Sequence, residues 1–329
     1  MPSRLRVAMA GAGFASGLHL AGWKRLASAE VVAICDPEEH KALERAREFG
    51  VPAVYRDARV MLAAEHPDAL DIVAPLHAHV PLCLLASDKG VHILCQKPLA
   101  PSVEEAWRLT QAVEGRVRLM VHENWRFRAH YRQLKRWVES GDIGVPLSCS
   151  VHVASSGLLQ DANGVRPQLV RQPFFAELDR LLIGEALIHQ LDVLRWLLGP
   201  LRVVAARTGR LCPVVRGEDH AVIVLDGENC WAVLEGSYVQ PNAPPLGSDD
   251  LELRGTRGVA QLRGSTLTLS GDRQDTIPLD LAAGYADSYA AVIAHFVEAL
   301  TTNTPFETDP HDNLQTLALV ESAYAMATR

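Results

Sequence analysis

Short apolar runs alternate with amphipathic stretches of helical spacing over about the first 120 residues. The apolar runs cover residues 5–9, 31–35, 70–74, 91–95 and 118–121. Their length and continuous apolar character are typical of parallel strands buried on both faces. Helical spacing occupies the segments between them, at about 16–26, 37–50, 80–88 and 102–113. This alternation predicts a parallel sheet with right-handed crossovers.

Two local signals support the predicted helix boundaries. Gly50 follows the helix that begins at Pro37, and glycine is the residue that most often ends a helix in a left-handed conformation. Ser102 and Glu105 have the spacing of a capping box, so we expect a helix to begin there.

The pattern changes after about Glu123. Alternating apolar and polar positions follow, and Asp226-Gly227 separates two such runs at 221–225 and 231–239. That arrangement predicts a β-hairpin, and the second half as a whole predicts a mainly antiparallel sheet. Helices are expected at about 131–140, 181–198, 286–300 and 311–327. We therefore predict an α/β protein of two domains, residues 1–123 and 124–329.

Composition narrows the class of partner. The chain has 329 residues, 48% of them hydrophobic, and a net charge of -7 without a long block of one sign. Such a surface repels nucleic acid and anionic membranes, so a small-molecule partner is favoured. No apolar run approaches the roughly 18 residues of a membrane span, and no signal-peptide core follows Met1, so we expect a cytoplasmic protein. The six cysteines are scattered, and the spacings predict neither disulfides nor a metal site.

The first turn resembles a dinucleotide-binding loop. Gly11 and Gly13 lie between the first strand and the first helix, with Ser16 in the third position of the motif. Gly11 permits a tight turn, and Gly13 lets the backbone approach a pyrophosphate at the helix N-terminus. Asp36 ends the second strand, where a carboxylate binds the adenosine ribose and repels a 2′-phosphate, so NAD is favoured over NADP. The alternative for Asp36 is a cap on the helix that begins at Pro37, and both roles are compatible.

A lysine stands just beyond the fourth long strand, in the sequence Gln96-Lys97-Pro98. Ligands of open α/β sheets bind beyond the carboxyl ends of the strands, so Lys97 is placed to meet a substrate. A surface Lys-Pro turn is an equally simple interpretation of these residues alone.

Three polar residues share one side of the helix expected at 181–198. Glu185, His189 and Asp192 stand at positions i, i+4 and i+7. A solvated polar face is the usual explanation of such spacing. Here the rest of the helix is apolar almost all round, which predicts burial and favours a functional role for the polar residues.

Taken together, these segments resemble the glucose–fructose oxidoreductase, inositol dehydrogenase and rhizopine-catabolism (Gfo/Idh/MocA) family over nearly the whole chain. The matching segments are Gly11-Ala12-Gly13-Phe14, Asp36, Ala74-Pro75-Leu76-x-x-His79, Gln96-Lys97-Pro98-Leu99, and Glu185-x-x-x-His189-x-x-Asp192 followed by Leu194-Arg195-Trp196-Leu197-Leu198-Gly199. The resemblance implies an N-terminal Rossmann domain and a C-terminal α/β domain with an open, mainly antiparallel sheet. It also implies homodimers or homotetramers built on sheet faces.

The resemblance assigns roles to residues. Lys97 inherits hydrogen bonding to the reacting hydroxyl beside the nicotinamide, and His189 inherits the role of proton acceptor, for which an imidazole with an ordinary pKa near about 6.5 is suited. Two positions depart from the family pattern, because Gln96 replaces a glutamate and Glu185 replaces an aspartate. Both changes leave the chemistry in place and put substrate positioning in question. The predicted NAD-binding residues are Gly11, Gly13, Phe14, Ala15, Asp36, Pro75, His79, Gln96 and Lys97.

Two further segments predict substrate contacts. Asn124, Trp125 and Arg126 follow the last strand of the first domain and resemble a segment that many family members place beside substrate. Arg171 lies in a long aperiodic stretch from about 155 to 179, and an arginine there is suited to grip a carboxylate. A surface ion pair is an equal alternative for Arg171. We therefore expect Lys97, Glu185 and His189 to bind the substrate together with these residues, with a sugar acid slightly favoured over a neutral sugar or inositol.

These features predict an NAD-dependent dehydrogenase that oxidises a secondary hydroxyl of a sugar, polyol or sugar acid. Lys97, His189 and Glu185 are its expected catalytic residues. Two alternatives stay open: an NAD-dependent glycosidase of the same family, and a non-enzymatic NAD-binding sensor. A sensor has no need of a proton acceptor, so the presence of both Lys97 and His189 argues against it.

Overall fold

The computed structural model describes residues 4–327, and the chain folds into two compact units. The first unit contains residues 4–127 and 285–317, and the second contains residues 128–284 and 318–327. Helix α9 (Leu281–Thr302) therefore crosses from the second unit to the first, and α10 (Pro310–Ala327) crosses back. The assignment of NAD binding to residues 1–123 and of substrate binding to residues 124–329 stays a prediction.

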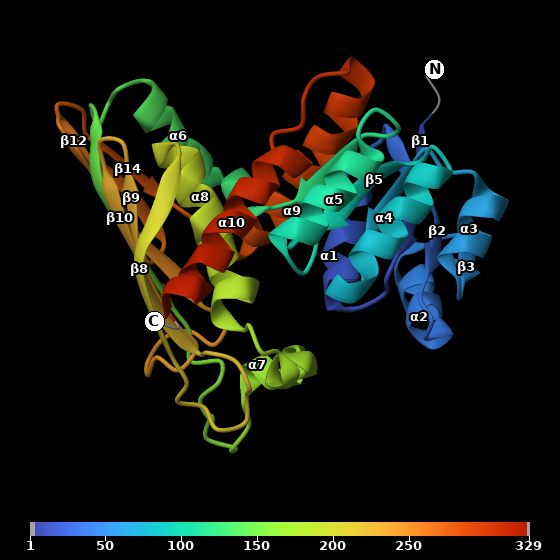
Figure 1. Cartoon of the computed structure of the whole chain (residues 1–329), viewed down its shortest axis with the longest axis horizontal. Coiled ribbons are helices and arrows are strands. Elements are labelled where there is room, and N and C mark those ends of the chain that lie inside the picture. Colours follow the sequence, from blue (N-terminus) through green and yellow to red (C-terminus); the bar gives the residue numbers. More distant parts are fainter. Residues whose placement is uncertain (1–3, 328–329) are drawn as a thin grey trace. The chain divides into compact units, whose positions relative to one another are not determined.

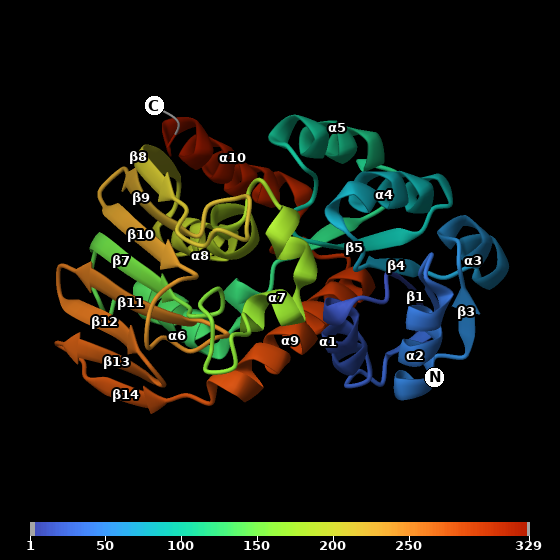
Figure 2. The same ribbon diagram turned by 90° about the horizontal axis from the view of Figure 1, so that it is seen from below.

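The first unit is built on a six-stranded parallel sheet in the order β3-β2-β1-β4-β5-β6 (Figures 1 and 2). Its strands are β1 (Leu5–Ala10), β2 (Ala29–Cys35), β3 (Ala53–Tyr55), β4 (Ala69–Ile72), β5 (His92–Gln96) and β6 (Leu119–His122). Its helices are α1 (Phe14–Trp23), α2 (Glu39–Phe49), α3 (Ala58–Glu65), α4 (His79–Asp88) and α5 (Val103–Val113), with 3₁₀ turns at Leu76–Ala78 and Trp125–Phe127. Helices α4 and α5 lie on one face of the sheet and α1 lies on the other (Figure 2). The parallel α/β architecture predicted from the alternation is confirmed.

Local capping explains where two of these helices stop and start. Gly50 follows α2 with φ 74°, and its amide donates to the carbonyl of Ala46 at 2.8 Å. The Ser102 hydroxyl accepts from the amide of Glu105 at 3.1 Å at the start of α5. Both predicted boundaries are therefore confirmed.

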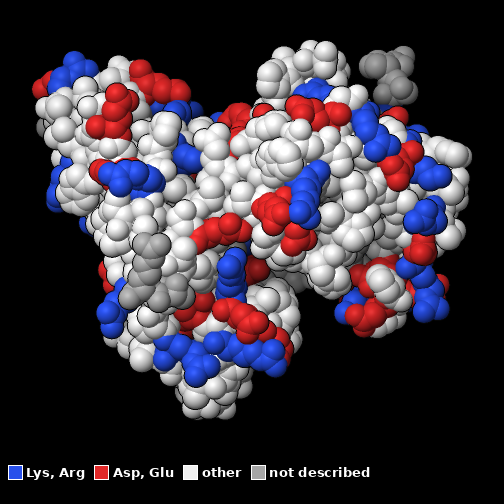
Figure 3. Space-filling view, in the orientation of Figure 1, with Lys and Arg blue, Asp and Glu red and all other residues white. Residues whose placement is uncertain are grey.

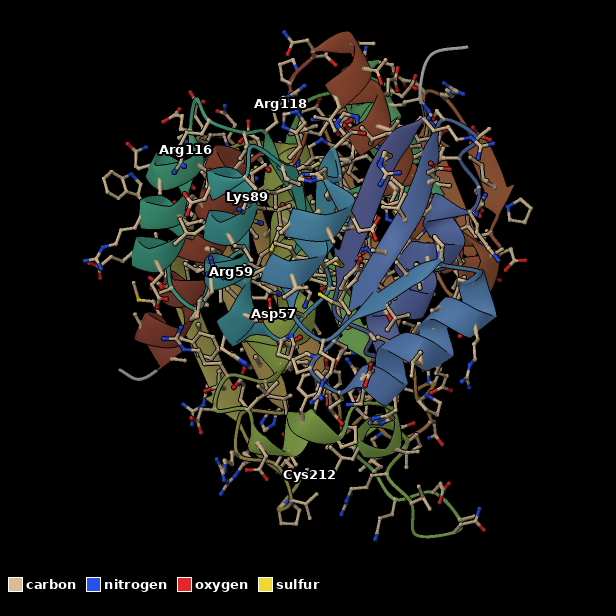
Figure 4. All side chains as sticks on the ribbon, turned by 90° about the vertical axis from the view of Figure 1, so that its right-hand side faces the viewer. Asp57, Arg59, Lys89, Arg116, Arg118 and Cys212 are labelled. Atoms are coloured by element: carbon tan, nitrogen blue, oxygen red, sulfur yellow. The ribbon has the colours of Figure 1, made fainter. Side chains whose placement is uncertain are left out.

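The sequence pattern missed β3 and α3. Strand β3 has only three residues, all half-buried, at the edge of the sheet, so it carries no recognisable apolar run. Helix α3 begins at an N-cap, Asp57, whose carboxylate accepts from the amides of Arg59 and Val60 at 2.7 and 3.1 Å (Figure 4). The crossover between β2 and β4 thus contains a full strand and helix.

Arg118 fastens the C-terminal part of α9 (Leu281–Thr302) to the start of β6 (Figure 4). Its guanidinium donates to the carbonyls of Ala299, at 2.6 Å, and of Thr304, and it lies 4.1 Å from the centre of the Phe306 ring. Earlier in α9, Ile293 packs so closely against α1 that a Cβ at Gly22 would lie 2.8 Å from it. These contacts explain why residues 285–317 fold with the N-terminal part of the chain.

The second unit contains an eight-stranded sheet in the order β14-β13-β12-β11-β7-β10-β9-β8. Its strands are β7 (Pro146–Ala154), β8 (Leu201–Gly209), β9 (His220–Gly227), β10 (Trp231–Ser237), β11 (Ser248–Gly255), β12 (Gly258–Arg263), β13 (Thr266–Gly271) and β14 (Asp275–Pro278). All neighbouring strands are antiparallel except β7 and β10, which run parallel. The prediction of a mainly antiparallel sheet is confirmed.

The predicted hairpin is present, but its turn was misplaced. Strands β9 and β10 pair with Asp226 opposite Trp231, so Asp226 and Gly227 belong to the strand. The turn is closed by the amide of Gly227 donating to the carbonyl of Cys230 at 2.8 Å. It therefore has two further residues at its tip rather than a two-residue Asp-Gly turn. Arg202 of β8 contacts the Asp226 carboxylate, which gives that residue a partner within the sheet.

The remaining helices of the second unit are α6 (Ala129–Glu139), α7 (Pro167–Arg171), α8 (Ile188–Leu198) and the end of α10 (Pro310–Ala327), with a 3₁₀ turn at Pro173–Glu177. The stretch expected to be aperiodic from 155 to 179 thus contains two short helical turns. Arg166 donates to the carbonyl of Leu158 and closes this stretch on itself. Across residues 4–327, each helix is too short or too polar to span a bilayer.

Charges are mixed on the surface. In Figure 3, Lys and Arg side chains lie next to Asp and Glu side chains over the visible face. Arg116 and Asp88, for example, form an exposed ion pair of 2.8 Å. Exposed pairs of this kind contribute little to stability, about 0–1 kcal/mol each.

Because the buried His130 of α6 resists protonation, we expect the folded chain to lose stability in acid. Burial, helped by the charge of Arg128 and opposed by that of Asp249, lowers the pKa of His130 from its ordinary value to about 3. Between about pH 3 and 6.5 the unfolded chain therefore binds a proton that the folded chain does not, so stability falls as the pH falls through that window. The loss is at most about 1.4 kcal/mol for each pH unit below about 6.5.

We expect His130→Phe to flatten the dependence of the unfolding free energy on pH between about 6.5 and 4, measured by urea denaturation. His40→Phe, at an exposed position of α2, serves as the control and should keep the wild-type slope. An unchanged slope in His130→Phe would show that another group causes the acid sensitivity.

Candidate active site

The glycine-rich turn between β1 and α1 is held close to β4. Gly11 has φ 106°, and a Cβ built on it would lie 2.3 Å from the carbonyl oxygen of Val73. Only glycine fits this position without strain. Gly13 is the N-cap of α1, and no other described atom lies within 4 Å of a Cβ built there. The neighbouring Phe14 is half-exposed.

Asp36 braces this turn from the end of β2. One carboxylate oxygen accepts from the amide of Ala12 at 2.9 Å, and the other accepts from the amide of Glu38 at 2.9 Å. The second bond closes a turn before α2, whose N-cap is Glu38, so Asp36 is not the N-cap of this helix that the sequence offered as its alternative role. Each carboxylate oxygen can accept more than one hydrogen bond, so these two bonds leave acceptor capacity for a ligand.

His79 connects the carboxyl ends of β4 and β5. It is buried at the start of α4, with Nε2 2.9 Å from the carbonyl oxygen of Ala74 and Nδ1 2.8 Å from that of Pro98. Carbonyl oxygens only accept, so the imidazolium form satisfies both contacts at once. The 3₁₀ turn between Pro75 and His79 thus leads directly to the segment that follows Lys97.

Lys97 follows the last residue of β5 and is half-buried. Its amide donates to the side-chain oxygen of Gln96 at 3.1 Å, and its peptide bond to Pro98 is cis. The predicted position at the carboxyl end of a parallel strand is therefore the observed one.

A buried polar network lies beside Gln96 and was not foreseen from the sequence. His19 Nδ1 lies 2.9 Å from Asp71, and its Nε2 lies 2.8 Å from the amide nitrogen of Gln96. The indole of Trp23 donates to the same carboxylate at 2.7 Å. His19 and Asp71 are completely buried, and the ring of His122 lies 4.1 Å from that of His19, centre to centre.

The segment after β6 is tied to the C-terminal part of the first unit. Asn124 donates its amide nitrogen to the hydroxyl of Ser288 at 2.8 Å, and the ring of Trp125 meets that of Tyr285 edge-on. Arg126 is buried and forms a 2.8 Å ion pair with Asp312. These contacts give Asn124 and Arg126 a structural role, and their contact with a substrate stays a prediction.

In the second unit, Glu185 lies within a widened helical turn, and His189 lies in the first turn of the α-helix that follows. Residues Ile183–Leu187 form a π-helical turn, and α8 begins at Ile188, so the expected continuous α-helix is interrupted. Within this turn, the amide of Gly184 donates to the hydroxyl of Tyr324, a residue of α10, at 3.2 Å. π-Turns inside helices occur often at functional sites, and the glycine is the one sequence signal that hints at it.

His189 is buried, as the apolar surroundings of this helix predict. Asp192 is buried as well and lies 3.7 Å from the guanidinium of Arg195 on the same helix. A buried carboxylate is costly unless it is paired, so Asp192 belongs to the structure of the helix.

The buried phenol of Tyr238 is within reach of the charges of Glu185 and Arg171. Burial raises the pKa of the Tyr238 phenol, the Glu185 carboxylate raises it further, and the Arg171 guanidinium opposes them. Such effects require proximity, so these three side chains share one neighbourhood. Arg171 also donates to the side-chain oxygen of Gln168 at 2.7 Å. Tyr238, which the sequence did not indicate, is therefore influenced by the charges of two predicted substrate residues.

The six cysteines are free thiols, and all of their side chains are buried. Burial raises the pKa of Cys35 to about 12, with contributions from Asp36 and Asp57. The thiolate is the reactive form, so Cys35 is inert at neutral pH.

Comparison with known proteins covers both units. Residues 5–123 match the model of an oxidoreductase family with an NAD-binding Rossmann fold, and residues 131–261 match a Gfo/Idh/MocA C-terminal domain. D-apiose dehydrogenase of Paraburkholderia graminis is 33% identical over 98% of this chain and 88% of its own length. D-apiose dehydrogenase of Rhizobium rhizogenes is 31% identical over 99% of this chain and 96% of its own length. A crystal structure of an oxidoreductase from Agrobacterium radiobacter with NAD⁺, L-tartaric acid and magnesium matches with a TM-score of 0.92 and 30% identity, over 99% of this chain and 97% of that one.

Proposed function

Because the chain belongs to the Gfo/Idh/MocA family of NAD-dependent oxidoreductases, we propose that it oxidises a secondary hydroxyl of a branched aldose such as D-apiose. The observation that carries this choice of substrate is the similarity of nearly the whole chain to two D-apiose dehydrogenases. The family resemblance predicted from the sequence motifs is confirmed. The chain is a dehydrogenase and its cofactor is NAD.

The glycine-rich turn fits this cofactor. Gly11 brings the turn against β4, Gly13 leaves space at the N-terminus of α1, and backbone amides there suit a pyrophosphate. In the proposed site Phe14 and Ala15 continue this turn, Asp36 binds the adenosine ribose, and Pro75, His79, Gln96 and Lys97 line the nicotinamide end. Bound NAD supplies a hydride acceptor.

The chain's own residues supply the proton chemistry in this proposal. As the carbon–hydrogen bond breaks and its electron pair leaves with the hydride, the hydroxyl proton passes to His189 and the carbonyl forms. The Lys97 ammonium stabilises the alkoxide that develops on the same oxygen. Glu185 orients His189 or holds a second hydroxyl of the sugar. Asn124, Trp125, Arg126 and Arg171 complete the proposed substrate contacts.

The substrate is tested by following NADH absorbance with purified enzyme and a panel of D-apiose, D-ribose, myo-inositol, D-apionate and L-tartrate. We expect kcat/KM to be highest for D-apiose, and product analysis then identifies the oxidised carbon. A higher kcat/KM for a cyclitol or an acid would reject the branched aldose. Release of a glycosidic leaving group without net NADH formation would favour the glycosidase, and NAD binding without turnover of any carbohydrate would favour the sensor.

Replacement of Arg171 tests whether the substrate is a sugar acid or a neutral sugar. If its guanidinium binds a carboxylate, Arg171→Met should raise KM for acids at least about tenfold more than for neutral sugars, because a bidentate pair contributes strongly to anion binding. With a neutral aldose as substrate, we expect KM to change less than about fivefold. Arg216→Met, at an exposed ion pair of the same unit, is the control.

Asp36 should set the choice of cofactor. Asp36→Asn keeps one acceptor oxygen for the neighbouring amides and removes the charge that repels a 2′-phosphate. We expect the ratio of kcat/KM for NAD to that for NADP to fall at least about tenfold, which is roughly 1.4 kcal/mol. An unchanged ratio would show that Asp36 only holds the backbone at Ala12 and Glu38.

We also propose that the enzyme is a homo-oligomer joined through an open sheet face. Trp231 and Val222 lie on neighbouring strands β10 and β9 and are 51% and 37% exposed. Exposed apolar groups of this kind favour burial against a second copy. Light scattering at micromolar concentration tests this, and a monomeric mass would reject it.

A further inference from the structure

The side chain of Gln96 joins the backbone of Lys97 to the buried pair of His19 and Asp71. Its oxygen accepts from the Lys97 amide at 3.1 Å, and its nitrogen lies 2.8 Å from Nε2 of His19 and 3.4 Å from Nδ1 of His122. The proton transfer proposed above does not use these contacts. They therefore need a separate explanation.

The Lys97 amide determines which way the Gln96 side chain points. A backbone N–H can only donate, so the atom of Gln96 that faces it must be the oxygen. The other end of the side chain is then an NH₂ group, which also can only donate. Nε2 of His19 must consequently accept, and it carries no proton.

The single proton of the His19 ring is thus fixed on Nδ1. From there it is donated to Asp71, which also accepts from the indole of Trp23. Both His19 and Asp71 are completely buried, so the geometry describes a neutral imidazole donating to a buried carboxylate. The rings of His122 and Tyr289 pack against His19 at 4.1 and 5.4 Å and close the remaining sides.

Protonation of His19 would disrupt this arrangement. An imidazolium needs an acceptor at Nε2, and the Gln96 side chain can offer its oxygen there only by turning over. Its NH₂ group would then face the Lys97 amide, donor against donor, and the Lys97 backbone would lose its anchor. In this chain, a proton on Nε2 of His19 and the anchoring of Lys97 exclude each other.

We propose that Gln96 is a positioning residue that makes the placement of Lys97 depend on a neutral His19. The effect on turnover rests on the proposed catalytic role of Lys97, whereas the hydrogen-bond pattern does not. The groups that face His19 are Asp71, Gln96 and Trp23 through hydrogen bonds and His122 and Tyr289 through their rings.

Glutamate at position 96 provides the decisive variant. Its two oxygens can accept from the Lys97 amide and from a protonated His19 at the same time. We expect Gln96→Glu to convert His19 to the imidazolium at neutral pH and, because it keeps an acceptor for the Lys97 amide, to have a kcat at least about tenfold above that of Gln96→Met. Gln96→Met has similar size and neither bond, and we expect it to lower kcat about 10- to 100-fold, a larger effect than its effect on KM for NAD. Gln111→Glu and Gln111→Met, at an exposed position of α5, should match the wild type.

The protonation state is measured by ¹⁵N NMR of the full-length enzyme labelled in its 13 histidines, with the His19 signals assigned by their loss in His19→Gln. A neutral ring protonated on Nδ1 in the wild type and an imidazolium in Gln96→Glu would support the proposal. A wild-type ring protonated on Nε2 would overturn it, as would full kcat in Gln96→Met when Lys97→Ala is inactive. If Lys97→Ala stays active, the proposed catalytic role of Lys97 fails, and the histidine spectrum alone then decides the hydrogen-bond pattern.

Discussion

Lys97→Ala is expected to lower kcat for sugar oxidation at least about 10³-fold while NAD affinity changes less than about threefold. In the proposed mechanism the ammonium acts on the charge that develops as the hydroxyl proton leaves, so its loss affects the transition state far more than cofactor binding. Removal of a single charge-stabilising donor commonly costs two to three orders of magnitude in kcat. Because Lys97 stands at the carboxyl end of β5, it is well placed for such a role.

Two measurements make this prediction specific. Single-turnover hydride transfer is followed by NADH absorbance, and the NAD dissociation constant is measured separately by calorimetry. Lys89→Ala is the matched control, because Lys89 is an exposed lysine at the end of α4 in the same unit (Figure 4). A Lys97→Ala enzyme with normal hydride transfer would remove Lys97 from the mechanism. An enzyme that loses NAD affinity instead would assign Lys97 to cofactor binding.

The parallel sheet was predictable because burial on both faces leaves continuous apolar runs in the sequence. Strand β3 was missed because its three half-buried residues, at the edge of the sheet, produce no such run. The π-turn before α8 was missed because Glu185 and His189 keep the same separation in the sequence whichever helix type connects them. The hydrophobic pattern indicates which residues are buried, but it does not indicate whether a single helical turn is α or π.

The polar network around Gln96 could not be predicted, because its members are distant in the sequence. His19 and Asp71 are 52 residues apart, and His19 and Gln96 are 77 apart. Each residue alone is an ordinary polar residue within an apolar segment. The ion pair of Arg126 with Asp312 could not be predicted for the same reason, because these residues are 186 positions apart. Sequence motifs identified the end of β5 as important, and only the three-dimensional structure shows what holds it.

Replacing each glycine of the first turn by alanine should separate folding from cofactor binding. At Gly11 the new Cβ would lie 2.3 Å from the Val73 carbonyl oxygen, at a φ of 106° that side-chain-bearing residues rarely adopt. The carbonyl cannot retreat freely, because the amide of Val73 donates to Ala10 at 2.8 Å and holds β4 beside β1. Backbone strain of about 1–3 kcal/mol and a comparable cost of overpacking predict that Gly11→Ala destabilises the first unit by about 2–5 kcal/mol.

Gly13→Ala is the matched partner of Gly11→Ala, with the opposite expectation. Beyond its neighbours in the chain, no described residue lies within 4 Å of its new Cβ, and its φ of -73° suits any residue, so the unfolding free energy should change by less than about 0.5 kcal/mol. The added methyl group would occupy the approach to the amides at the start of α1, so we expect the NAD dissociation constant to rise at least about tenfold. Urea denaturation and calorimetric NAD titration of both variants test this pair. Wild-type NAD affinity in Gly13→Ala would mean that the pyrophosphate does not approach the backbone at Gly13, and wild-type stability in Gly11→Ala would mean that the turn can move away from β4.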